Sequence, residues 1–249
     1  MHKYANPTEF MRIANGIFPW AAGLAVLLFA VGLPMALVFS PADFQQGDAA
    51  RIMYVHVPAA WMSLMVYAIM AAGSAAFLIW RHPMANLVAR ASAPLGAMFT
   101  ALCLVAGMLW GKPMWGAYWV WDARLTSELM LLFLYIGYLA LTDAFEDPDR
   151  GDKVAAMVAL VGSVNLPIIH FSVDWWNTLH QPSILTMKGF TVSASMLVPL
   201  FLMVGAFTAY YVALLVLRLR AEILAVKIRN ARSARAAAVP LGALTEGTS

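Results

Sequence analysis

Two histidines in apolar, aromatic surroundings are the residues of this chain whose types and positions suit chemistry best. His56 lies in the segment RIMYVHVPAAW, and His180 lies in WWNTLHQPS. An ionisable side chain in or beside a membrane-spanning segment is costly to keep there, so it is a functional candidate by default. Taken alone, each histidine is better explained as a neutral ring hydrogen-bonded to a neighbouring helix. The aromatic residues around both favour a ligand site.

A tryptophan-rich stretch, residues 110–128, provides those aromatic surroundings on a larger scale. It reads WGKPMWGAYWVWDARLTSE, with four tryptophans in its first twelve residues. An aromatic belt at the membrane interface accounts for one or two such residues per helix end. It accounts less well for four tryptophans so close together. We therefore interpret the stretch as a surface for a flat, amphipathic ligand, with the belt as the alternative.

The elements that must position these residues are membrane helices. The chain has 249 residues, of which 62% are hydrophobic and 12% charged, whereas about a quarter of the residues of a soluble domain are charged. Backbone groups inside a bilayer must pair internally, and the alternation of a barrel is absent, so an all-α polytopic membrane protein is expected. We predict one membrane domain over residues 1–217, followed by a basic cytoplasmic tail, 218–249, that is partly disordered. The six predicted spans are about 17–39, 52–80, 91–109, 129–145, 154–173 and 190–217.

The basic residues predict the orientation of these spans. Twelve Lys and Arg residues fall on the side of both termini and four on the other side, so the termini are expected in the cytoplasm. The N-terminal run is expected to remain as an anchor rather than to be cleaved. Both histidines and the tryptophan stretch then lie at the outer face. The four basic residues on that face are Arg51, Lys112, Arg124 and Lys188.

Haem is the ligand that these residue types fit. A six-coordinate haem takes one axial ligand from each face, which His56 and His180 could provide. Tryptophans pack a porphyrin disc, and the guanidinium forks of Arg51 and Arg124 suit its two carboxylates. Zinc fits less well, because it needs four ligands and no thiolate or close histidine pair is present. A Met114 ligand is possible but less economical than two histidines.

Several residues near the site also have plain structural explanations. Asp122 could cap a helix that begins at Ala123, and Glu128 could pair with Arg124 at the i, i+4 spacing. Cys103 is the single cysteine, so no intrachain disulfide and no C-x-x-C-H haem-attachment motif is possible. No G-x-x-x-x-G-K-[ST] loop is present, so nucleotide hydrolysis by that route is not expected.

The segment WGKPMWGAYWVWDARLTSELMLLFLYIGYLAL resembles the "WWD" motif of haem-handling proteins of cytochrome c biogenesis. The segments PADFQQGDAARIMYVHVPAAWMS and NLPIIHFSVDWWNTLHQPS resemble one of these families in particular, the CcmC family (haem exporter protein C). The resemblance covers about residues 18–217. It implies axial haem ligands at His56 and His180, with His170 beside the site but not a ligand. The implied platform consists of Trp110, Trp115, Tyr118, Trp119, Trp121 and Asp122.

The resemblance also implies a location, a role and partners. It implies a multi-pass protein of the bacterial inner membrane that holds b-type, non-covalent haem at the periplasmic face and is not an enzyme. The implied partners are the haem chaperone CcmE, which receives the haem, the ATP-binding-cassette pair CcmA and CcmB, and the small subunit CcmD. No nucleic acid is expected. Two alternatives remain open: a channel-like exporter that moves haem across the bilayer, and a haem lyase subunit of the CcmF or CcsA type. A structural membrane scaffold is a third.

Overall fold

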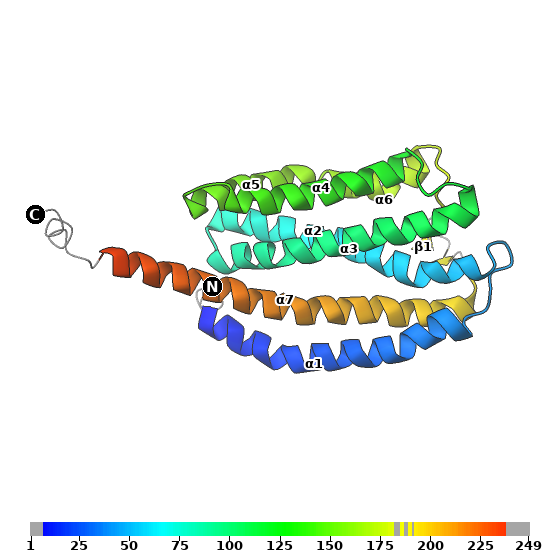
Figure 1. Cartoon of the computed structure of the whole chain (residues 1–249), viewed down its shortest axis with the longest axis horizontal. Coiled ribbons are helices and arrows are strands. Elements are labelled where there is room, and N and C mark those ends of the chain that lie inside the picture. The colour runs from blue at the N-terminus through cyan, green and yellow to red at the C-terminus, as the bar shows by residue number, and fades with distance from the viewer. Residues whose placement is uncertain (1–6, 182–184, 187–188, 191, 238–249) are drawn as a thin grey trace, which may run out of the picture.

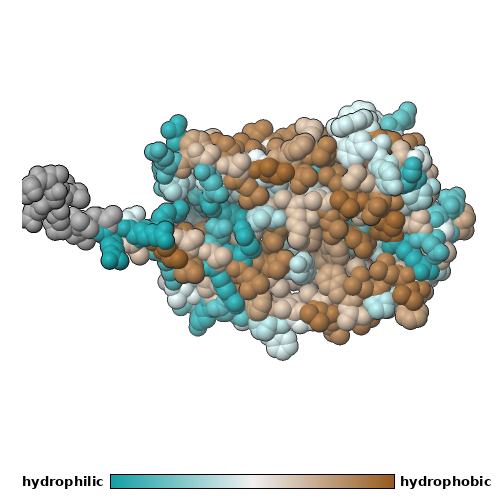
Figure 2. Space-filling model, viewed as in Figure 1, coloured by the Kyte–Doolittle hydropathy of each residue, from teal (hydrophilic) through white to brown (hydrophobic). Residues whose placement is uncertain are grey.

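The computed structural model describes residues 7–181, 185–186, 189–190 and 192–237. Within these residues, six helical segments are long and apolar enough to cross a membrane, which confirms the all-α fold with six spans. They lie side by side in one elongated bundle (Figure 1). Figure 2 shows an apolar middle between two polar ends, as expected for a multi-pass membrane protein.

The helices follow one another with short connections. Only four residues, in two short antiparallel strands between α6 and α7, are in a β-ladder within the described part of the chain. The elements are α1 (Pro7–Pro34), the π-helical η2 (Met35–Phe39), the 3₁₀-helical η3 (Asp48–Ile52), α2 (Met53–Trp80), α3 (Pro83–Trp115), α4 (Ala123–Asp143), α5 (Pro148–Gly162), α6 (Asn165–Trp175), β1 (Leu185–Thr186), β2 (Gly189–Phe190) and α7 (Ala194–Ala237).

The helices α2 and α3 lie in the middle of the bundle. On one side, α7 packs against both middle helices and carries α1 on its outer face; on the other side lie α4, α5 and α6 (Figure 1). The start of α1 and the end of α7 lie at the same end of the bundle. The loops that hold the tryptophan stretch and His180 therefore gather at the opposite end.

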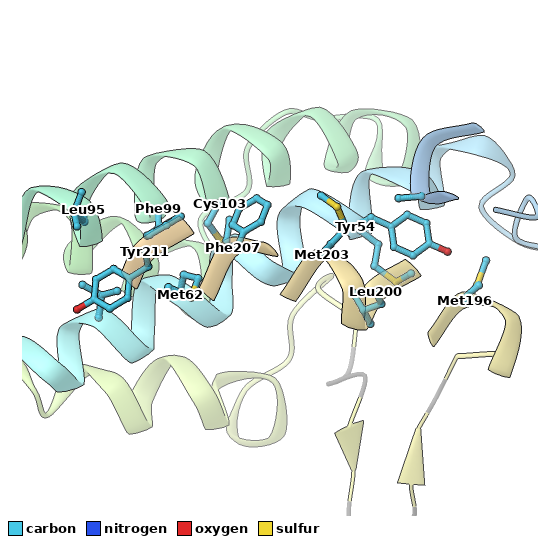
Figure 3. Close-up of a cluster of buried hydrophobic side chains, with 14 of the residues drawn as sticks. Tyr54, Met62, Leu95, Phe99, Cys103, Met196, Leu200, Met203, Phe207 and Tyr211 are labelled. Atoms are coloured by element: carbon cyan, nitrogen blue, oxygen red, sulfur yellow. The ribbon is translucent and has the colours of Figure 1, made fainter. Parts of the chain in front are cut away.

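The core between α2, α3 and α7 is closely filled by large apolar side chains. Figure 3 shows Tyr54 and Met62 of α2, Phe99 of α3 and Met203 and Phe207 of α7 meeting along the bundle axis. The rings of Phe99 and Phe207 lie 5.9 Å apart. This packing fixes α2 against α3, and α2 and α3 carry His56 and the first tryptophans of the stretch.

Several helix ends differ from the sequence prediction. α3 continues to Trp115, where Gly116 adopts a left-handed conformation (φ 75°) and ends the helix. α4 begins at Ala123, so the tryptophan stretch is a non-helical loop only over residues 116–122. The fifth span consists of two helices, α5 and α6. α7 runs on through most of the basic tail to Ala237, and the rest of the tail, predicted to be disordered, lies outside the described residues.

Candidate functional site

His56 lies in the first turn of α2 and points into the bundle towards α3. Its side chain is buried, with 9% of its surface exposed. Its Nδ1 atom lies 3.0 Å from the main-chain carbonyl oxygen of Cys103. Because a carbonyl only accepts, Nδ1 carries the proton in this contact and Nε2 has a free lone pair.

His180 lies in the loop that follows α6, and its ring approaches that of His56. Its Nδ1 atom is 2.8 Å from the carbonyl oxygen of Gln181, so its Nε2 is likewise left unprotonated. The centroids of the two imidazole rings are 6.1 Å apart, and the ring planes differ by 39°. The two histidines, which are 124 positions apart in the sequence, therefore meet with the same tautomer.

The electrostatic surroundings keep His180 in the neutral, metal-binding form. Burial lowers the pKa of His180 below its ordinary value of 6.5, and the positive charge of Arg124 lowers it further. A backbone carbonyl is one of the usual partners that orient a ligating histidine through its other ring N–H. Both imidazoles thus have the tautomer and the second hydrogen bond that axial metal ligands need.

Two of the predicted platform tryptophans contact the histidines directly. The ring of Trp110 meets that of His56 edge to face at 5.7 Å, and its indole N–H donates to Gln46 Oε1 at 2.9 Å. The ring of Trp115 lies 6.4 Å from that of His180. These tryptophans stand at the C-terminal end of α3, beside the histidine pair.

The other platform aromatics lie farther along the loop. Trp119 and Trp121 pack against each other at 5.3 Å, and Trp121 is 77% exposed. Tyr118 is exposed and lies under the ammonium of Lys112, which is 5.3 Å from the ring centroid. The described contacts of these three residues do not include either histidine.

Asp122 joins the tryptophan loop to the loop of His180. One of its oxygens accepts a hydrogen bond from the backbone N–H of Leu125 at 2.8 Å, which confirms its predicted role as the cap of α4. Its other oxygen accepts from the hydroxyl of Thr178. The Thr178 hydroxyl oxygen in turn accepts from the backbone N–H of His180 at 3.0 Å. A pocket of about 240 Å³ opens between these loops, lined by Val120, Trp121, Asp122, Asn177, Thr178 and Leu179.

The two predicted propionate-binding arginines have different environments. Arg124 donates to the carbonyl of Ile169 in α6, and its charge reaches His180. Arg51 donates to the carbonyl of Leu37 at 2.6 Å and pairs with Asp48 at 3.1 Å. Arg51 therefore fastens the π-helical segment to the start of α2, and Arg124 is the arginine whose charge acts on the histidine pair.

The remaining metal-ligand candidates lie apart from this pair. His170 is exposed on α6, and its ring contacts Phe171 at 4.7 Å. No group of three or more His, Cys, Asp or Glu residues in the described part of the chain could hold a metal ion. Lys188, one of the four basic residues predicted on the outer face, is outside the described residues.

Sequence reasoning did not identify the groups that orient His56. They are the carbonyl of Cys103 and the bare backbone of Gly107, where a Cβ atom would lie 3.0 Å from the imidazole. Glu128, one turn after Arg124, accepts a hydrogen bond from Ser63 Oγ at 2.7 Å. The ion pairs of the described residues do not include the expected pair of Glu128 with Arg124.

Comparisons with known proteins agree on one family. The family model "CcmC: Heme exporter protein C" matches residues 1–234. A "Heme exporter protein C" of Bradyrhizobium diazoefficiens is 49% identical over 227 residues, which cover 91% of this chain and 86% of that protein. The Escherichia coli K12 protein of the same name is 46% identical over 92% of this chain and 93% of its own length. A "Putative cytochrome c biosynthesis ccmC-like mitochondrial protein" of Marchantia polymorpha is 48% identical over 74% of this chain and 78% of its own length. The chain therefore belongs to the CcmC family of haem exporter proteins.

Proposed function

We propose that the chain binds haem at the outer end of its helical bundle, with His56 and His180 as the two axial ligands, and passes it on for cytochrome c maturation. The pairing of the two imidazoles is the observation that carries this proposal. Their ring centroids are 6.1 Å apart. Two metal–nitrogen bonds of about 2 Å, together with the ring radii, require a separation of roughly 6 Å.

The surroundings of the two rings suit a porphyrin better than a bare metal ion. Trp110 and Trp115 supply large aromatic faces at the rim of the pair, and a porphyrin disc packs well against such faces. Arg124 supplies a positive charge for the carboxylates at the disc edge. The two imidazoles supply two nitrogen ligands. A porphyrin supplies the other four nitrogens of a six-coordinate iron, whereas a tetrahedral zinc ion would need two further ligands.

Holding and presenting haem is supported over moving it through a channel. Both imidazoles lie at one end of the bundle, whereas the space between α2, α3 and α7 is filled with apolar side chains (Figure 3). In the 116–122 loop, Gly116, Tyr118 and Trp121 are exposed. An exposed rim of this kind leaves one edge of the ligand accessible to a receiving protein. A haem lyase of the CcmF or CcsA type is less well supported, because those proteins are longer and have more spans and histidines.

The proposed setting follows from family membership. The chain is a multi-pass membrane protein and a transport component rather than an enzyme. We place it in the bacterial inner membrane with its haem site facing the periplasm, non-covalent b-type haem as its cargo and CcmE as the recipient. CcmA, CcmB and CcmD are its proposed partners. Residues 1–217 are the proposed membrane domain, and 218–249 are the proposed cytoplasmic tail.

Haem spectra of single-histidine variants test the proposal. The protein is purified in detergent with haem, and the variants His56→Ala, His180→Ala and His170→Ala are compared with the parent. We expect the first two to lose the six-coordinate spectrum and the third to keep it, because His170 is exposed and away from the pair. If both His56→Ala and His180→Ala retained the six-coordinate spectrum, the two-histidine site would be wrong.

A further inference from the structure

A buried carboxyl group lies directly beneath the proposed haem site. Glu128 is on α4, inside a membrane-spanning segment, and only 5% of its surface is exposed. A carboxyl group in that environment is costly whether it is charged or merely polar, unless it is hydrogen-bonded. The hydrogen-bond partners of the Glu128 carboxyl group therefore explain how it can lie in the core.

The hydrogen-bond partner of Glu128 comes from another helix. Ser63 Oγ of α2 donates to Glu128 Oε1 at 2.7 Å, and Ser63 is buried. Tyr135, two turns farther along α4, donates to the carbonyl oxygen of Ser63 at 2.8 Å. Ser63 is thus the residue at which polar contacts join α2 to α4.

The two helices joined at Ser63 each lead to one of the two histidines. Ser63 lies two turns from His56 on the same face of α2. The cap of α4, Asp122, accepts from the hydroxyl of Thr178, which in turn accepts from the backbone N–H of His180 at 3.0 Å. Arg124 lies one turn before Glu128 on the same face of α4. A shift of α2 relative to α4 at this level would change the distance between His56 and His180.

We propose that Glu128 is a positioning residue for the haem site: by accepting from Ser63, it holds α2 in register with α4 and so keeps His56 placed opposite His180. This inference rests on the proposed function of the chain. Glu128 does not touch the ligand. It acts through the register of α2, which carries His56, and α4, whose cap Asp122 is bonded to the loop of His180.

Three variants test the role of the carboxyl. Glu128→Leu removes the acceptor, so the Ser63 hydroxyl keeps only its bond to the carbonyl oxygen of Ala60 at 2.8 Å within α2, and the bond from Ser63 to α4 through residue 128 is lost. We expect Glu128→Leu to lose haem about tenfold faster and to contain a five-coordinate fraction. Glu128→Gln keeps an acceptor oxygen, so we expect it to retain the six-coordinate spectrum and to lose haem within about threefold of the parent rate. Ser63→Ala removes the bond to Glu128, together with the bond to the Ala60 carbonyl within α2, and should shift the spectrum in the direction of Glu128→Leu.

A second buried carboxyl group supplies the matched control. Asp152 is 7% exposed and bonds Asn86 and Arg90 at 2.6 Å each, away from the histidine pair. Asp152→Leu should lower the melting temperature without changing the haem spectrum. If Glu128→Leu and Ser63→Ala gave the parent spectrum and haem-loss rate while His56→Ala lost the ligand, the role of Glu128 would be wrong and the haem site would stand. If His56→Ala and His180→Ala also bound haem as the parent does, the proposed function itself would fail.

Discussion

Gly107 of α3 lies against the ring of His56 so closely that a Cβ atom at residue 107 would be 3.0 Å from Cε1 and 3.4 Å from Nδ1 of the imidazole. The ring is therefore held between the α3 backbone at Gly107 and the carbonyl of Cys103, one turn earlier. Its position depends on the absence of a side chain at residue 107.

The first prediction follows from this contact. Gly107→Ala should push the imidazole by a few tenths of an ångström, strain its hydrogen bond to Cys103 and increase the rate of haem loss several-fold. Transfer of haem to an excess of a scavenger protein measures that rate. Gly137→Ala on α4 is the matched control, because no atom lies within 4 Å of a Cβ at that position. It should leave haem loss unchanged and be neutral or slightly stabilising, as Ala is in a helix. Equal haem-loss rates for the two variants would show that the contact of Gly107 with the His56 ring does not affect haem binding.

The second prediction separates the two arginines. Arg124 acts on His180, whereas Arg51 is bonded to Leu37 and Asp48. We expect Arg124→Gln to weaken haem retention by about ten- to a hundredfold, the range for hydrogen bonds to charged groups, and Arg51→Gln to act mainly on stability. Arg124→Lys keeps the charge but lacks the planar fork and should be intermediate. Haem content after gel filtration reports retention, and an unchanged content in the double Gln variant would rule out a propionate clamp.

The third prediction concerns orientation. Phe44, in the connection between η2 and η3, is 91% exposed, and Glu146, in the turn between α4 and α5, is exposed at the opposite end of the bundle. The native Cys103 is buried, so it should give little background with a thiol reagent. In intact cells, a membrane-impermeant maleimide should label Phe44→Cys, and it should label Glu146→Cys only after the membrane is opened. The reverse pattern would place the haem site in the cytoplasm.

The sequence predicted the six spans because length and hydropathy decide them without reference to neighbours. It also predicted the cap at Asp122, since a cap is a local contact. The apolar run predicted as the third span ends at about Leu109, where polar Lys112 and Pro113 lower the hydropathy, whereas the helix α3 continues to Trp115. The α3 helix therefore extends beyond the end of its apolar run.

Contacts between distant segments were outside the reach of the sequence. The pattern predicted that Glu128 could pair with Arg124 on its own helix, but the carboxyl bonds Ser63, 65 residues away. Arg51 was placed at the propionates from its position at a helix end, and its bond to Leu37 depends on the π-helical turn of residues 35–39. A glycine in an apolar run gives no sign that it faces an imidazole.

Both histidines are oriented by main-chain oxygens, those of Cys103 and Gln181. A carbonyl group is present whichever amino acid occupies a position. A substitution at residue 103 or 181 therefore leaves the acceptor of each Nδ1–H in place. Both positions are free to change during evolution without loss of the imidazole tautomers. Relatives that keep the two histidines should tolerate varied side chains at both positions, and proline at 103 would be excluded by its effect on α3 rather than by chemistry at the iron.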